Sequence, residues 1–220
     1  MKPIDMNERY PGYNVLNKRN SPSWNDQTRE VIDARLAIDA DFHRFCDEAE
    51  WQTLCAVCNQ IIPQPDHRCP KVPIAAMVDQ KLYSGKGDGY RDARLPAQSE
   101  AWRKGLAAIN AEAALEGGKP FCELAQEQQR VVLLKVQKGE VASPAWEGLS
   151  PQLFFAKRLL HDVVTAYFAH PASWSEIGFG GPASPRGYVR MNFDRRDPWE
   201  ASEARPGREE EARRENEHVG

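Results

Sequence analysis

The chain has 220 residues, of which 41% are hydrophobic and 28% are charged, and its formal net charge is −3. These values are typical of a soluble globular chain that forms one domain, with or without extended arms. The lack of a basic excess argues against binding to nucleic acid. No apolar run of about 18 residues exists, so we expect no direct membrane span.

Residues 1–24 are predicted to form an N-terminal arm. Two turns, Tyr10-Pro11-Gly12-Tyr13 and Ser21-Pro22-Ser23-Trp24, interrupt this segment. It contains neither the apolar stretch of a secretory signal nor a twin arginine. By its own sequence the chain is therefore expected to be cytoplasmic. The alternative is the periplasm, which the chain would reach by export together with a signal-bearing partner.

Residues 25–170 are predicted to form a helical domain, because hydrophobic residues recur there at three- and four-residue steps. The expected helices cover residues 25–38, 47–62, 74–83, 98–116, 123–138 and 150–170. Asp47 and Glu50 have the spacing of a capping box at the start of the second helix. No alternating strand pattern is longer than a few residues. The predicted fold class is therefore mainly α, an irregular bundle of about five or six helices with extended N- and C-terminal arms.

The helix expected over residues 150–170 is the most apolar, which is typical of a helix central to a core. Ser150 can cap this helix, and Pro151 suits its first position. Its buried face is predicted to consist of Leu153, Ala156, Leu160, Val163, Val164 and Tyr167, widened by Phe154, Phe155, Leu159 and Phe168. Pro171 is expected to end it.

Residues 171–199 are predicted to form an irregular arm, because glycines and prolines alternate there with large apolar residues. Such an arm lies either on its own domain or on another protein, and we favour a partner because interfaces are enriched in aromatic residues and arginine. The candidate partner-binding residues are Trp174, Ile177, Phe179, Gly180, Gly181, Arg186, Tyr188 and Arg190. Residues 200–220 form a charged tail that we expect to be disordered or a frayed helix.

The segment Ser150 to Met191, together with the earlier stretches CNQIIP and VPIAAMVDQKL, resembles the gluconate 2-dehydrogenase subunit 3 family. The resemblance covers roughly Trp24 to Trp199. Proteins of this family are small subunits of bacterial flavin-dependent sugar and alcohol dehydrogenases, and they often carry the twin-arginine signal that is missing here.

The resemblance implies a non-catalytic accessory subunit of a membrane-associated or soluble dehydrogenase. Its main partner would be a large subunit of the glucose–methanol–choline type, and a cytochrome c subunit is a further candidate partner. The large subunit would carry FAD, and this chain would hold no cofactor. The small subunit would assist the folding, flavin loading or export of the large one.

The alternative is a small metal-binding interaction protein. Cys55, Cys58, His67 and Cys69 could form a zinc site with three thiolates and one imidazole. However, Cys55 and Cys58 fall on the apolar stripe of a predicted helix, where cysteine usually packs as a small hydrophobic residue. We therefore favour core packing for these two residues.

Two further patterns are considered and set aside. The loop SGKGDGYRD is rich in glycine, but it lacks the spacing of a P-loop and no strand precedes it. His161 and Asp162 are neighbours in a helix and point to different sides, so they are not expected to form a catalytic pair. The sequence gives no set of catalytic residues.

Overall fold

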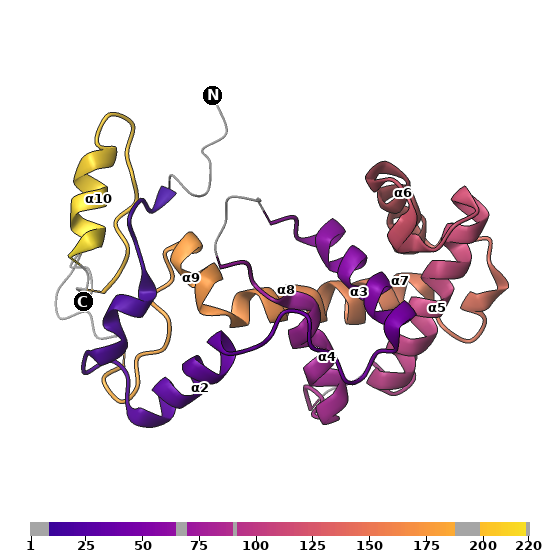
Figure 1. The fold of residues 1–220 in the computed structure, drawn as a ribbon, viewed down its shortest axis with the longest axis horizontal. Coiled ribbons are helices and arrows are strands. Elements are labelled where there is room, and N and C mark those ends of the chain that lie inside the picture. Colours follow the sequence, from indigo (N-terminus) through magenta and orange to yellow (C-terminus); the bar gives the residue numbers. More distant parts are fainter. Residues whose placement is uncertain (1–8, 65–69, 90–91, 188–198, 219–220) are drawn as a thin grey trace. The chain divides into compact units, whose positions relative to one another are not determined.

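The computed structural model describes residues 9–64, 70–89, 92–187 and 199–218. In these residues the fold is mainly α, as predicted, and the only strand-like feature is an isolated bridge between Trp24 and Ser184. None of the described helices combines the length and the apolar character needed to cross a membrane. Figure 1 shows the elements in chain order.

The chain divides into two compact units. The central unit comprises Ile38–Tyr167, and the terminal unit combines Met1–Ala37 with Phe168–Gly220. This division differs from the predicted one, in which residues 1–24, 171–199 and 200–220 were separate arms and a tail. The two ends of the chain instead form a unit together.

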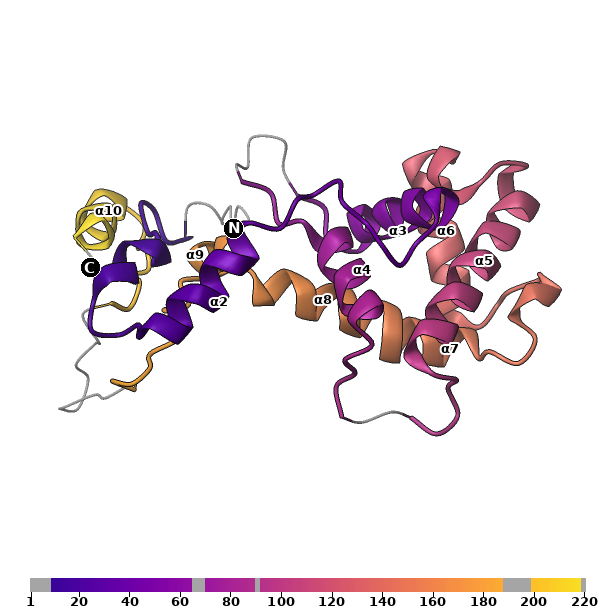
Figure 2. The same ribbon diagram turned by 60° about the horizontal axis from the view of Figure 1, so that its bottom comes forward.

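The helices of the central unit lie close to the predicted positions. They are α3 (Glu48–Ile61), α4 (Ile74–Ser84), α5 (Gln98–Gly117), α6 (Gln126–Lys138), α7 (Pro151–Phe154) and α8 (Leu160–Ala169). The expected capping box is present, since Asp47 accepts from the backbone N–H of Glu50 at 2.9 Å and Glu50 accepts from that of Asp47 at 3.0 Å. Figures 1 and 2 both show α3, α5, α6 and α7 side by side.

The core of the central unit is centred on α5. Trp102 is fully buried and meets the ring of Phe154 edge to face, with 5.7 Å between the ring centroids. The helices approach closely at Gly105, where a Cβ atom would lie 2.1 Å from Cζ of Phe154. Glycine at this position therefore lets the ring pack directly on the backbone of α5.

A π turn at Phe155–Leu159 joins α7 to α8. The buried face of this long helix differs from the predicted one, because Leu160 is 39% exposed and Ala156 is also exposed. Two rows of residues four apart are buried instead: Phe154, Arg158, Asp162 and Ala166 in one, and Phe155, Leu159, Val163 and Tyr167 in the other. The hydrophobic pattern misses this face because it includes two charged residues.

A buried carboxylate fixes the loop that precedes α3. Asp79 of α4 is 2% exposed and accepts hydrogen bonds from the backbone N–H groups of Arg44, Phe45 and Cys46 at 2.7–3.2 Å. The aspartate in the stretch VPIAAMVDQKL thus satisfies three backbone donors that the irregular loop leaves without a partner of its own.

The terminal unit contains short helices from both ends of the chain. They are the 3₁₀ helix Val15–Asn20, α2 (Asp26–Leu36), α9 (Pro171–Ile177) and α10 (Glu209–Glu217). Pro171 follows the end of α8 as predicted, but it also opens α9 at the first helical position. His170 caps this new helix, because its Nδ1 accepts from the N–H of Ala172 at 3.2 Å.

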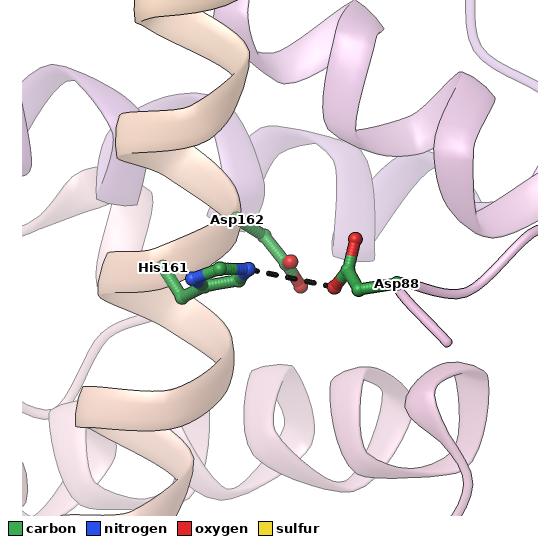
Figure 3. A group of neighbouring side chains, drawn as sticks. All are labelled: Asp88, His161 and Asp162. Atoms are coloured by element: carbon green, nitrogen blue, oxygen red, sulfur yellow. Dashed lines mark ion pairs between the residues drawn. The ribbon is translucent and has the colours of Figure 1, made fainter. Parts of the chain in front are cut away.

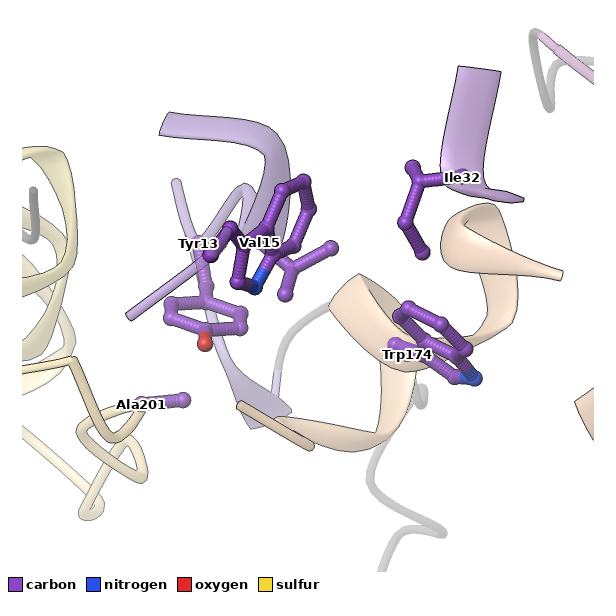
Figure 4. Packing of buried hydrophobic residues seen from close by; sticks show 6 residues of the cluster. Tyr13, Val15, Ile32, Trp174 and Ala201 are labelled. Carbon is purple, nitrogen blue, oxygen red and sulfur yellow. The ribbon is translucent and has the colours of Figure 1, made fainter. Parts of the chain in front are cut away.

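The core of the terminal unit joins the two ends of the chain (Figure 4). Its buried residues are Tyr13, Val15, Trp24, Ile32, Trp174 and Ala201. The indole of Trp24 donates to the carbonyl oxygen of Pro182 at 2.8 Å, and the N–H of Asn25 donates to that of Ser184 at the same distance. The expected N-terminal arm is therefore an integral part of a packed unit.

The C-terminal tail, for which we expect disorder or a frayed helix, contains the helix α10. Its helix α10 buries Ala212 and Asn216, while its charged residues form surface pairs such as Arg208 with Glu211. The composition of the tail was misleading because the helix is attached through one small residue and one amide rather than through large apolar residues.

Candidate functional site

The predicted partner-binding residues lie in the terminal unit, and several of them are used inside it. Trp174 is only 4% exposed, and Gly180 and Gly181 are also buried. These three residues form part of the unit's own packing, which leaves little of their surface open to a partner. Their apolar character is explained by the N-terminal segment that they cover.

Two other predicted residues remain accessible. Phe179 is 44% exposed and meets the Trp174 ring edge to face at 5.8 Å between centroids. Ile177 is half-buried. The guanidinium of Arg186 lies 4.4 Å from the centroid of the Trp199 ring, and its Nε donates to Ser23 Oγ at 2.9 Å. Tyr188 and Arg190 lie outside the described residues.

Arg35 and Phe179 both contact the ring of Trp174. The guanidinium carbon of Arg35 lies 6.0 Å from the Trp174 centroid, and its Nη1 donates to the carbonyl oxygen of Ala169 at 2.8 Å. Burial lowers the pKa of this guanidinium from its ordinary value. Beside it, a groove of about 270 Å³ is lined by residues that include Val31, Arg35 and Pro182. We call Val31, Arg35 and Phe179 the Trp174 surface.

The Trp174 surface presents chemistry suited to protein recognition. Val31 is 46% exposed and Phe179 is 44% exposed, so this surface combines an accessible aliphatic and an accessible aromatic side chain with a positively charged one. Aromatic residues and arginine anchored by neighbouring packing are typical of interface hot spots.

A separate polar network lies in the central unit and was not predicted (Figure 3). Asp162 is 2% exposed and accepts hydrogen bonds from Trp102 Nε1 at 2.8 Å and Gln98 Nε2 at 3.1 Å. His161 Nε2 lies 3.4 Å from an oxygen of Asp88. Among the described residues His161 and Asp162 form no ion pair with each other, but the loop after α4 brings Asp88 close to both.

The ligand atoms of Asp88, His161 and Asp162 lie within 4.8 Å of one another, as a metal site would require. However, Lys81 Nζ lies 2.7 Å from Asp88 and 3.1 Å from Asp162. The ammonium group therefore already supplies the cation that the two carboxylates need. We interpret the group as a structural ion-pair network that joins α4, α5 and α8.

The sequence carried one signal for this network. Arg158 and Asp162 are four residues apart, with opposite charges, on a helix that is otherwise strongly apolar. Buried charges are retained in a core only when they are paired. Such a pair on an apolar helix therefore indicates polar partners on other elements.

The cysteines of the alternative zinc site are only partly described. Cys58 is buried and Cys55 is half-buried on α3, and both carry free thiols. Burial raises the pKa of both thiols, that of Cys55 to about 11. Because a thiolate is the form that binds zinc, these surroundings favour packing. His67 and Cys69 lie outside the described residues.

A family model described as Gluconate 2-dehydrogenase subunit 3 matches residues 48–181. The matched segment begins at the first residue of α3 and ends at Gly181, so it contains nearly all of the described central unit and the whole of α9. No curated protein and no solved structure matches the chain.

Proposed function

Since the chain belongs to the gluconate 2-dehydrogenase subunit 3 family, we propose that it is a non-catalytic small subunit of a flavin-dependent sugar or alcohol dehydrogenase. The family match over residues 48–181 is the observation that carries this proposal. In the proposed complex, a large subunit of the glucose–methanol–choline type holds FAD and performs the oxidation. The present chain contributes a binding surface and no flavin ligand.

The Trp174 surface is the proposed contact with the large subunit. Phe179 can bury its exposed ring in a pocket of the partner, and Arg35 can pair with a carboxylate at the rim of that pocket. Both side chains contact the ring of Trp174, which holds them in place before binding. Pre-organised anchors of this kind lose little conformational entropy when the complex forms.

The proposed benefit to the large subunit is assistance with folding, flavin loading or export. A partner that binds only the folded form stabilises that form by mass action. The proposed compartment is the cytoplasm; the alternative is the periplasm, which the chain would reach if it were exported while bound to a signal-bearing subunit. A cytochrome c subunit is a further candidate member of the complex.

Co-expression with the candidate large subunit tests the proposal. A tag on the present chain should capture the large subunit in a fixed ratio, and visible absorbance should show bound flavin in the captured complex. The control is the large subunit expressed alone, which should be recovered in lower yield or with less flavin. A large subunit that is fully loaded without this chain and is not captured by it would refute the proposal.

A further inference from the structure

The terminal unit contains a groove of about 270 Å³ that follows α2 beside the Trp174 surface. Thr28, Val31 and Arg35 line it, and because they lie three and four residues apart they share one face of the helix. Ile32 closes the groove toward the core of the unit, where only 1% of its surface is exposed (Figure 4). We call this feature the α2 groove. The proposed function assigns Arg35 to an interface but gives the groove no occupant.

Both walls of the α2 groove are fixed before a partner binds. Pro182 and Ser184 form the wall opposite the helix. Their carbonyl oxygens accept hydrogen bonds at 2.8 Å from the indole of Trp24 and the N–H of Asn25, respectively. The side chain of Asn25 also caps α2, because it accepts from the N–H of Thr28 at 2.9 Å. A groove held in this way loses little conformational entropy when a segment enters it.

Arg35 carries the only charge among the described residues that line the α2 groove. The other lining residues are apolar or neutral: Asn25, Gln27, Thr28, Val31, Ile32, Pro182 and Ser184. Within the described part of the chain, the guanidinium donates one hydrogen bond, from Nη1 to the carbonyl oxygen of Ala169, and pairs with no carboxylate. Burial lowers the pKa of this guanidinium, so its charge is partly removed from water without a counterion.

The other arginines near α2 are neutralised within the unit. Arg29 pairs with Asp26 at 2.8 Å, and Arg19 pairs with Asp33. Arg35 differs from both, although it lies on the same helix as the two aspartates. The uncompensated positive charge beside an apolar groove is therefore complementary to a carboxylate that comes from outside the chain.

We propose that the α2 groove binds an extended segment of the large subunit in which an aspartate or glutamate lies next to an apolar residue; this inference rests on the proposed function. The carboxylate would pair with Arg35, whose planar fork suits two parallel hydrogen bonds. The apolar side chain would lie between Val31 and Pro182. At about 270 Å³ the groove is smaller than ordinary small-molecule pockets of about 300–1,000 Å³, so it admits one or two side chains of a segment.

Two variants of Val31 test this inference in the full chain. Val31 is 46% exposed, so replacing it leaves the core intact. Val31→Glu places a carboxylate one turn before Arg35, a spacing at which the two side chains pair on a helix, so the variant supplies the missing counterion itself. Val31→Gln removes the same apolar surface but adds no charge. The purified large subunit should bind Val31→Glu at least about tenfold more weakly than Val31→Gln.

The outcomes separate this inference from the proposed function. The melting temperature of Val31→Glu should not fall below that of Val31→Gln, so weaker binding would not reflect unfolding. Equal binding by the two variants would overturn the inference and leave the proposed function standing, because the complex would still form. Failure of the wild-type chain to capture the large subunit would overturn both.

The charge of Arg35 can also be removed directly. Arg35→Gln should weaken binding of the large subunit by about tenfold or more at low ionic strength, and the difference should shrink as salt screens the pair. Arg130→Gln is the control, because Arg130 is an exposed arginine of the central unit that pairs with Glu127. It should change neither the affinity nor its salt dependence. The same salt dependence for Arg35→Gln and the wild type would overturn the inference.

Overlapping peptides with amidated ends, each of about 15 residues, can show whether the bound segment is linear. The full chain should bind peptides that contain an acidic residue beside an apolar one. Replacing that acid by its amide should abolish binding. Binding of the intact large subunit without binding of any peptide would overturn the inference alone, since a folded surface would then be the ligand. Binding that requires the free C-terminal carboxylate of the large subunit would likewise overturn it.

Discussion

The side-chain amide of Asn216 donates a 2.9 Å hydrogen bond to the carbonyl oxygen of Pro11, 205 residues earlier in the chain. The same nitrogen donates to the carbonyl oxygen of Ser202 at 3.0 Å, and Oδ1 accepts from the N–H of Ser202 at 2.6 Å. Asn216 has no exposed surface. One buried amide thus joins the last described helix to the first described turn.

Asn216→Ala should destabilise the terminal unit by roughly 1–3 kcal/mol, because it leaves backbone groups of Pro11 and Ser202 buried without a partner. Urea unfolding, followed by hydrogen exchange in the terminal unit, measures this loss. The control is Asn20→Ala, which removes an exposed amide and should change stability by less than about 0.5 kcal/mol. Equal unfolding midpoints for the two variants would show that α10 is not held by Asn216.

Gly105→Ala should destabilise the central unit by roughly 1–3 kcal/mol, although alanine favours helices over glycine by about 1 kcal/mol. The added methyl group would overlap the Phe154 ring, from which its carbon would be separated by only 2.1 Å. Thermal unfolding checks the prediction, since the melting temperature of Gly105→Ala should be lower than that of the wild type. In a Phe154→Leu background the same substitution should cost clearly less, because the smaller side chain leaves room. Additive effects of the two changes would contradict the close packing of this pair.

Asp162→Ala should cost roughly 3–5 kcal/mol, because it removes the acceptor of the buried Trp102 indole and one of the two carboxylates that pair with Lys81. Asp162→Asn keeps an acceptor for the indole and should cost less. Asp41→Ala, at an exposed position, is the matched control and should be nearly neutral. Denaturant unfolding of the three variants should give this order. A mild loss in Asp162→Ala would show that the network contributes little to the fold.

The contribution of Asp88 to stability should depend on pH. Its hydrogen bond from Lys81 holds the pKa of the Asp88 carboxyl below the ordinary value of 3.8. The folded chain therefore keeps this carboxyl ionised more readily than the unfolded chain does, and its stabilising effect is present above pH 3.8. The effect is lost as the pH falls through the lowered folded-state pKa.

Asp88→Asn should therefore unfold at lower urea concentration than the wild type near neutral pH, and the two midpoints should converge below about pH 4. The control replaces Lys81, the ion-pair partner of Asp88. In a Lys81→Met background, Asp88→Asn should have little effect on the urea midpoint. A difference between wild type and Asp88→Asn that stays constant across the acid range would argue against this ion pair.

Local patterns in the sequence were enough to predict the helices of the central unit. The capping box at Asp47 and Glu50 depends on residues three positions apart, and α3 begins directly after Asp47. Fold class follows from such local signals because helical hydrogen bonds are themselves local. The resemblance to the family likewise depended on the order of these stretches along the chain.

The remaining features depend on contacts between distant residues. Asp162 is buried because Lys81 and Trp102, on other helices, donate hydrogen bonds to its carboxylate. The tail packs in the terminal unit because Asn216 donates a hydrogen bond to the carbonyl oxygen of Pro11, at the other end of the chain. Composition cannot reveal a hydrogen-bond partner that lies 60 or 205 residues away in the chain.

Phe179→Ala should weaken the proposed complex with the large subunit by roughly 1–3 kcal/mol, the usual cost of truncating an aromatic anchor at an interface. Phe179 is 44% exposed, and its contact with Trp174 fixes the ring in place. The stability of the free chain should change by less than about 1 kcal/mol, because much of the ring is already in water. Binding of the purified large subunit to immobilised wild-type and variant chains gives the difference in affinity.

Phe42→Ala is the matched control, because Phe42 is 57% exposed and belongs to the central unit rather than to the Trp174 surface. Both substitutions remove the same side chain from an exposed position, so a general loss of surface hydrophobicity would affect them equally. We expect Phe42→Ala to bind the large subunit like the wild type. If Phe42→Ala weakens the complex and Phe179→Ala does not, the contact surface lies on the central unit. The family assignment would then stand, but the interface proposed at Trp174 would be wrong.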